Sequence, residues 1–168
     1  MAINLLKYAL VFIVSVLLQV LIFNNVLIAR MISPFFYILF IILLPFDTPR
    51  ALLLFLAFSL GLTVDIFTNT PGVHASACLL TGFVRPGVLQ LISSRETLES
   101  VSAPRVENMG FQWFIGYVTF LVLIHHFFLF FIEAFTFQGF PFILLRIILS
   151  SVLSVVLIVL SQFIIFRK

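Results

Sequence analysis

The sequence predicts an all-α protein, a polytopic membrane helix bundle with about six transmembrane helices. Hydrophobic residues make up 63% of the 168 residues and charged residues only 9%, whereas about a quarter of the residues in a soluble domain are charged. A chain of this length could not cover so much apolar surface with polar side chains, so lipid must surround most of it. The connections between apolar segments are too short for a soluble domain. We therefore expect a single integral membrane domain over residues 1–168.

Apolar segments divide the chain into the expected transmembrane helices. In order, they cover about residues 8–28, 31–46, 51–67, 72–92, 111–137 and 142–166. The first would be ~31 Å long at 1.5 Å per residue, which matches a hydrocarbon core. No small-residue cleavage site follows it, which argues against a removable signal peptide. The second is shorter and has Pro34 near its start.

Basic residues set the expected topology, because cytoplasmic loops are enriched in Lys and Arg. The one sustained polar segment, Ser93–Gly110, carries two arginines and three glutamates. Six spans with a cytoplasmic N-terminus leave only Arg30 outside. The basic residues placed inside are Lys7, Arg50, Arg95, Arg105, Arg167 and Lys168. A five-span alternative, with residues 31–46 not crossing and the N-terminus outside, satisfies the charges equally well. Both arrangements put the Asp65–His74 turn outside and the polar loop inside. We favour six spans, because Lys7 precedes a long apolar helix and residues 31–46 carry no charge.

The most informative segment is the polar turn within residues 61–77, which interrupts two apolar runs. Asp65 falls at the C-terminal end of the third expected helix, where the helix dipole makes a carboxylate unfavourable. Its presence there needs compensation. The simplest source is hydrogen bonds from backbone N–H groups in the Thr68–Gly72 turn or at the start of the fourth helix.

The neighbours of Asp65 are typical of a tight hairpin between two closely packed helices. Pro71 fixes one bend and Gly72 frees the next, with a positive φ expected at Gly72. Small residues over 75–77 would let the fourth helix pack closely on a neighbour. His74 is close enough in sequence to contact Asp65 as a structural acid–imidazole pair. The candidate structural or partner-contacting residues of this hairpin are Gly61, Asp65, Pro71, Gly72 and His74.

A charged residue interrupts the fourth segment at Arg85-Pro86-Gly87. Proline and glycine there predict a kink or a break. Arg85 lies roughly 12 Å from the inner end of the helix, by the 1.5 Å rise per residue, which is within reach of snorkelling. We expect it either to snorkel or to pair with a carbonyl exposed at the kink. A partner-binding or lipid-headgroup role is the alternative.

Opposite charges flank the short turn between the last two segments. Glu133 lies near the outer end of the fifth segment and Arg146 near the outer start of the sixth. Antiparallel neighbouring helices would bring them to a similar depth, where each alone would be costly. A structural ion pair is the favoured interpretation, and a substrate-coordinating pair is the alternative.

Other polar residues do not predict catalysis or a metal site. The sequence contains no Ser/His/Asp arrangement with a nucleophile turn, no HExxH motif and no phosphate-binding glycine loop. His125 and His126 are adjacent, so they project about 100° apart on a helix and cannot both face one ligand. Cys78 is the single cysteine, and the net charge of +3 is too small and dispersed for nucleic acid. We expect no enzymatic activity, cofactor, metal or nucleic-acid partner.

The hairpin residues carry a resemblance to a known family. The order Gly61-x-x-x-Asp65-Ile-Phe-Thr-x-Thr-x-Gly72-Val-x-Ala75 resembles the signature of MreD, the small integral membrane subunit of the bacterial rod-shape machinery, or elongasome. The proline-led second segment, the length of the chain and its basic C-terminal end are also similar to that family. The motif covers about 15 residues, and the similarity of layout covers the whole chain. The resemblance assigns no role to His74 or to the Arg85-Pro86-Gly87 interruption.

The resemblance implies a non-enzymatic membrane scaffold in the bacterial cytoplasmic (inner) membrane. The favoured six-span topology places both termini in the cytoplasm. MreD proteins are similar in fold to the substrate-binding subunits of energy-coupling-factor transporters. They associate with MreC, a single-span protein, and connect the MreB cytoskeleton to peptidoglycan synthesis by a RodA-type polymerase and a class B transpeptidase. The alternative function is a substrate-binding membrane subunit of a small-molecule transporter. Its pocket would draw on Asp65, Asn69, His74, Glu133 and Arg146.

Overall fold

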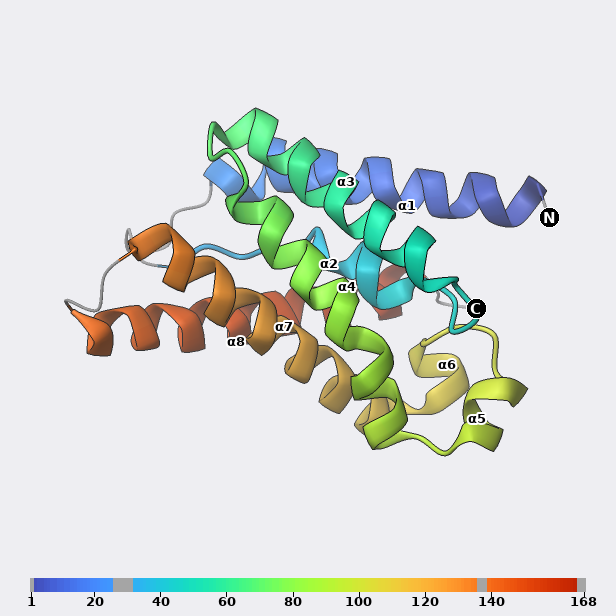
Figure 1. The fold of residues 1–168 in the computed structure, drawn as a ribbon. Coiled ribbons are helices and arrows are strands. Elements are labelled where there is room, and N and C mark those ends of the chain that lie inside the picture. Colours follow the sequence, from blue (N-terminus) through green and yellow to red (C-terminus); the bar gives the residue numbers. More distant parts are fainter. Residues whose placement is uncertain (1, 26–31, 136–138, 166–168) are drawn as a thin grey trace.

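The protein is an α-helical membrane bundle, shown in Figure 1 as a computed structural model that describes residues 2–25, 32–135 and 139–165. Within these residues, five helices are long and apolar enough to cross a membrane. They are α1 (Ala2–Leu21), α3 (Arg50–Thr68), α4 (Val73–Ile92), α7 (Phe111–Ala134) and α8 (Phe140–Ile165). The short helices are η1 (Phe23–Asn25), α2 (Ile38–Leu43), α5 (Arg95–Ser100) and α6 (Val106–Met109).

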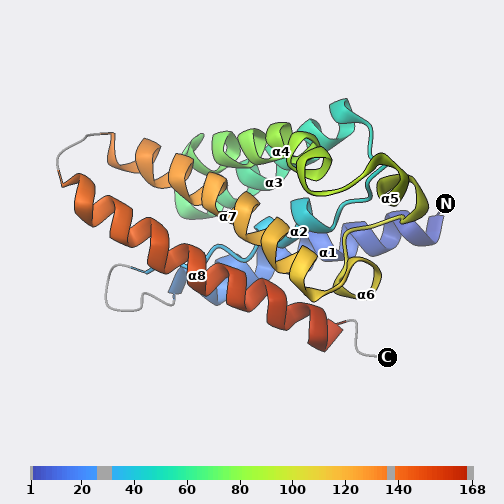
Figure 2. The same cartoon turned by 90° about the horizontal axis from the view of Figure 1, so that it is seen from below.

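The long helices run back and forth between two ends of the bundle. The α3–α4 turn, the end of α7 and the start of α8 lie at one end, here called the hairpin end. Helices α5 and α6 lie at the other, the loop end (Figures 1 and 2). Both the start of α1 and the end of α8 lie at the loop end (Figures 1 and 2). The five-span alternative requires the termini at opposite ends, so this arrangement disagrees with it.

The prediction of a transmembrane helix over residues 31–46 is wrong. Met31 lies outside the described residues, residues 32–37 are not helical, and α2 has only six residues. At 1.5 Å per residue α2 is about 9 Å long, too short to cross a membrane. The segment nevertheless passes through the bundle. Ser33 contacts α8 near the hairpin end, and the Phe46 N–H donates to the Ser102 carbonyl at the loop end.

Neighbouring side chains explain how this irregular backbone is tolerated. The Ser33 and Phe35 N–H groups donate to the hydroxyls of Ser150 (3.1 Å) and Ser154 (2.9 Å) on α8. Gln19 of α1 accepts from the Phe36 N–H at 2.8 Å and donates to the Pro34 carbonyl at 3.0 Å. All residues over 34–44 are buried. Non-helical backbone occurs at membrane depth only when protein covers it, and here five crossing helices and their polar side chains cover it.

The remaining boundaries follow the sequence closely. Helices α3 and α4 match the expected segments 51–67 and 72–92 within one residue at each end. The first helix begins earlier and ends earlier than the expected 8–28, while residues 26–28, 136–137 and 166 of the expected spans lie outside the described part. Helix α4 continues through Pro86, so the expected break is absent. Proline removes one hydrogen bond, to the Gly82 carbonyl, and the rest of the helix is retained.

The hydrophobic core lies between α2, whose residues are all buried, and the helices that surround it. Helix α3 packs on α4, α4 on α7 and α7 on α8, while α1 contacts α2 and α3. The outward faces of these helices expose large apolar side chains, including Phe55, Phe83 and Phe142. Such faces suit a lipid environment and would be unfavourable in water. Gln19, Asp65 and His74 are buried polar residues near the hairpin end, which holds the candidate site.

Candidate functional site

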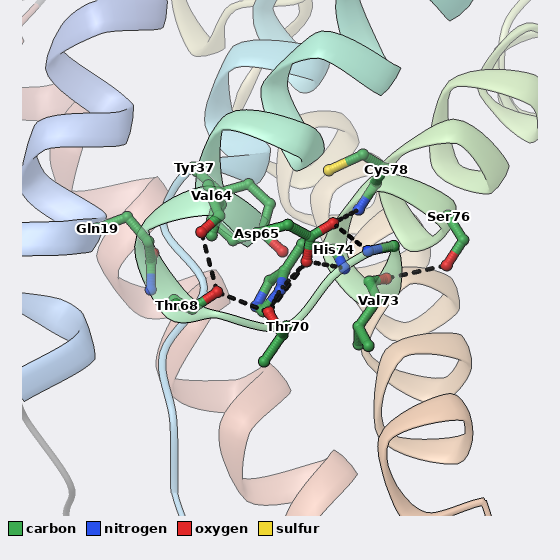
Figure 3. Close-up of polar contacts among 12 residues, drawn as sticks. Gln19, Tyr37, Val64, Asp65, Thr68, Thr70, Val73, His74, Ser76 and Cys78 are labelled. Atoms are coloured by element: carbon green, nitrogen blue, oxygen red, sulfur yellow. Dashed lines mark hydrogen bonds and ion pairs between the residues drawn. The ribbon is translucent and has the colours of Figure 1, made fainter.

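Asp65 is the centre of the hairpin. It lies in the last turn of α3, and only 2% of its surface is exposed. One carboxylate oxygen, Oδ2, accepts from the N–H groups of Gly72 (3.0 Å) and Ala75 (2.9 Å). The other, Oδ1, accepts from the His74 N–H (2.9 Å) and the Thr70 hydroxyl (3.0 Å), as Figure 3 shows. The carboxylate thereby caps the first turn of α4, whose N–H groups have no intrahelical partner. The expected hydrogen bonds to Asp65 are confirmed.

Two glycines give the hairpin its shape. A Cβ atom on Gly61 would stand 2.4 Å from the His74 carbonyl oxygen and 2.6 Å from the Ala75 nitrogen, so only glycine allows α3 and α4 this close. Gly72 precedes α4 with φ +88°, which confirms the positive φ expected there. Asn69 ends α3 in the left-handed conformation, with φ 57°. Pro71 is exposed at the tip of the turn.

His74 is held by the same carboxylate. Its Nδ1 lies 3.0 Å from Asp65 Oδ1 and 3.0 Å from the Thr70 hydroxyl, which in turn lies 2.6 Å from the Thr68 hydroxyl. Because a carboxylate only accepts hydrogen bonds, the contact with Asp65 assigns the proton to Nδ1 and leaves Nε2 as an acceptor. The structure therefore presents an oriented imidazole on α4, next to the turn.

A cavity of about 180 Å³ lies beside His74 at the hairpin end. Its wall combines polar groups with aromatic and aliphatic side chains. The lining residues are Gln19, Phe23, Asn24, Ser33, Phe35, Thr68, Thr70, Val73, His74, Leu129, Glu133 and Arg146. Helices α1, α3, α4, α7 and α8 and the irregular segment before α2 all contribute. Of the five residues expected to form a pocket, His74, Glu133 and Arg146 line this cavity, whereas Asp65 and Asn69 do not.

The expected Glu133–Arg146 ion pair is confirmed. Arg146 Nη1 lies 3.1 Å from Glu133 Oε2, and Nη2 lies 3.4 Å from Oε1. The Arg146 guanidinium also lies over the Phe130 ring, 4.3 Å from its centroid. The position of both residues within apolar segments suggested a buried pair. In the structure 34% of the Arg146 side chain and 41% of the Glu133 side chain are exposed. It therefore forms the rim of the cavity.

Arg85 lies apart from the cavity and does not snorkel. The residue is 1% exposed, and its guanidinium donates to the Leu44 carbonyl, to the Pro45 carbonyl (3.5 Å) and to the Tyr117 hydroxyl (2.8 Å). Leu44 and Pro45 come directly after the last residue of α2. Carbonyl groups at the C-terminal end of a helix have no partner within the helix, so they are available to Arg85. The expectation of a carbonyl partner is correct, but the carbonyls belong to α2 and its following residues, not to a kink in α4.

Two further polar clusters in the core went undetected in the sequence. The Tyr37 hydroxyl lies 2.9 Å from His125 Nε2, and His126 Nε2 lies 3.1 Å from the Ser154 hydroxyl. The two adjacent histidines thus face different partners. Among the described residues, no group of three or more His, Cys, Asp or Glu side chains could hold a metal ion. An aromatic residue in an apolar run, such as Tyr37, carries no sequence signal for such a contact.

Comparisons with known proteins do not assign this site. The chain matches no protein-family model. No curated protein matches it, and no solved structure does.

Proposed function

We propose that the chain is a non-enzymatic membrane scaffold of the bacterial cell-shape machinery, as its resemblance to MreD implies. In this role it lies in the bacterial inner membrane with both termini in the cytoplasm. It binds MreC and helps couple the MreB cytoskeleton to a RodA-type polymerase and a class B transpeptidase.

The proposal rests on the structural roles of the residues in the hairpin motif. Gly61 permits the close approach of α3 and α4, Asp65 caps α4, Gly72 supplies a positive φ and Ala75 donates to the carboxylate. Each of these residues is thus occupied in fixing the shape of the hairpin. A motif of this kind supports a rigid surface for a partner better than it supports a reaction.

The nature of the exposed surface supports a lateral partner. Apolar side chains dominate the outward faces of the long helices, and the α3–α4 turn is short. A partner with a membrane-spanning helix can contact both a helix face and the adjoining turn. Transmembrane helices associate by close packing and hydrogen bonds, without a hydrophobic driving force between them. MreC, as a single-span protein, has this form.

Affinity purification from native membranes tests the proposal. The tagged chain should retain MreC in stoichiometric amount. Asp65→Ala should reduce both the folded protein and the retained MreC, whereas Thr63→Val, away from the cap on the same helix, should leave both unchanged. If the correctly folded chain retains no MreC from membranes that contain it, the scaffold proposal is rejected.

The cavity favours a second candidate, a substrate-binding membrane subunit of a small-molecule transporter. Such a subunit needs a pocket with polar groups that opens to one side of the membrane, and the cavity has polar groups in its wall and a partly exposed rim. A small-molecule ligand retained by the purified protein, without MreC, would favour this function over the scaffold.

A further inference from the structure

The cavity at the hairpin end has the features of a binding site for a small molecule. Its volume is about 180 Å³. Pockets for drug-sized ligands are larger, about 300–1,000 Å³. The space therefore suits a compact molecule about the size of one free amino acid.

The charges at the cavity select the kind of molecule. Glu133 and Arg146 form a direct ion pair at the rim, so their net charge is zero. A zwitterion can interact favourably with both members of the pair, whereas a ligand with a single charge is attracted by one member and repelled by the other. Arg146 contacts Glu133 through Nη1 and Nη2. Each of these atoms has a second N–H, which can donate to a ligand carboxylate.

His74 provides a second polar anchor. Its Nδ1 is engaged by Asp65 and Thr70, which leaves Nε2 as the remaining acceptor of the ring. An ammonium group donates up to three hydrogen bonds, so it can be shared between the Glu133 carboxylate and His74. Phe23, Phe35 and Leu129 supply an apolar part of the wall.

We propose that this cavity binds a small zwitterion with an apolar side group, of the amino-acid class. The ligand carboxylate binds Arg146, its ammonium binds Glu133 and His74, and its side group packs on the apolar wall. The site goes beyond the scaffold function and does not depend on MreC binding. In the second candidate function it would be the substrate site.

Thermal unfolding of the purified full chain in detergent tests the ligand class. L-Leucine is the probe, with leucinol, which lacks the carboxylate, and 4-methylpentanoate, which lacks the ammonium, as matched controls. Leucine should raise the Tm in a saturable manner. Each control should bind at least about tenfold more weakly than leucine, because it loses one set of charge-assisted hydrogen bonds. Absence of a leucine shift, or equal shifts with all three compounds, would overturn the proposal.

Variants then locate the site. Val73→Phe should fill the cavity and remove the leucine shift, while Leu79→Phe, the control on the exposed face of the same helix, should keep it. The double variant Glu133→Gln/Arg146→Gln retains the shape of the rim without its charges and should also lose the shift. A leucine shift that persists in both the filled and the uncharged variant would place binding elsewhere. MreC co-purification, measured on the Val73→Phe chain, reports on the scaffold proposal separately.

Discussion

Gly61 of α3 and Ala75 of α4 lie so close that a Cβ atom on Gly61 would stand 2.5 Å from the Ala75 Cα. The glycine acts together with Asp65, four residues later on the same face of α3. Because the helices approach closely at Gly61, the carboxylate reaches the Ala75 N–H at 2.9 Å. The close approach and the cap are therefore parts of one arrangement.

We expect Gly61→Ala to destabilise the protein strongly. The new Cβ would meet backbone atoms, which cannot rotate away, so α3 and α4 would have to separate. Overpacking typically costs about 1–3 kcal/mol and sometimes more, and this contact should lie at the upper end. The matched control is Gly116→Ala on α7, where a Cβ would meet nothing within 4 Å. Thermal unfolding in detergent measures both, and equal Tm values for the two variants would contradict the expected close contact.

Asp65→Asn should be milder than Asp65→Ala, but it should not be neutral. Asparagine keeps one carbonyl oxygen, while its NH2 group would face backbone N–H donors in place of the second oxygen. Both oxygens of Asp65 accept backbone N–H groups, so at least one donor would lose its partner. An unsatisfied buried group costs about 1–3 kcal/mol. The order of the two Tm values checks this expectation, and an asparagine variant as stable as the original would show that the charge-assisted cap contributes little.

The sequence could predict this hairpin because its signals are local. A carboxylate at a helix end, a Pro-Gly turn and small residues in the next helix lie within residues 61–77, and their contacts lie there too. The long apolar helices were also predictable from composition. The Glu133–Arg146 pair followed from the short turn that joins α7 to α8.

The second crossing was not predictable, because its conformation depends on distant residues. The apolar run over residues 31–46 is compatible with a helix, and the partners of its backbone lie on α1 and α8. Burial of Arg85 has the same origin, since its carbonyl acceptors come from Leu44 and Pro45. The sequence around residues 31–46 does not indicate the contacts with α1 and α8, and the sequence around Arg85 does not indicate its carbonyl partners.

Arg85→Leu should destabilise the protein more than Tyr117→Phe. The leucine removes the donor from the Leu44 and Pro45 carbonyls and from the Tyr117 hydroxyl. The phenylalanine removes one acceptor of the guanidinium and the neutral hydrogen bond of 3.3 Å from the Tyr117 hydroxyl to the Ile42 carbonyl. A hydrogen bond to a charged group contributes about 1.5–3 kcal/mol. The double variant should be less damaging than the sum of the two single variants, because they share a contact. Strict additivity in thermal unfolding would argue that the Arg85–Tyr117 contact contributes nothing.

Neutralising one member of the Glu133–Arg146 pair should have a modest effect. The pair is partly exposed, so the ~3–5 kcal/mol cost of breaking a buried pair does not apply, and about 1 kcal/mol or less is expected. Glu133→Gln and Arg146→Gln should each lower the Tm slightly, and the double variant should recover part of the loss. Repeating the cycle at high salt should reduce the coupling if water reaches the pair. A large loss that is additive in the double variant would show that the two side chains act separately.

Reporter fusions should place the two termini on the same side of the membrane and Asn69 on the other. The segment over residues 32–46 passes through the bundle, so together with the five long helices the described residues run between its ends six times. Helix α1 starts at the end of the bundle where α8 ends (Figure 1). Of the six Lys and Arg residues in the described part, Lys7, Arg50, Arg95 and Arg105 lie toward the loop end, Arg85 is buried in the bundle and Arg146 lies at the hairpin end. This excess favours the cytoplasm for the loop end. Arg30, Arg167 and Lys168 lie outside the described residues.

A reporter at the N-terminus and one after Lys168 should therefore both be cytoplasmic, and one inserted after Asn69 should be extracytoplasmic. An N-terminal reporter outside, with the C-terminal one inside, would mean that residues 32–44 do not cross the membrane and that the five-span alternative is correct.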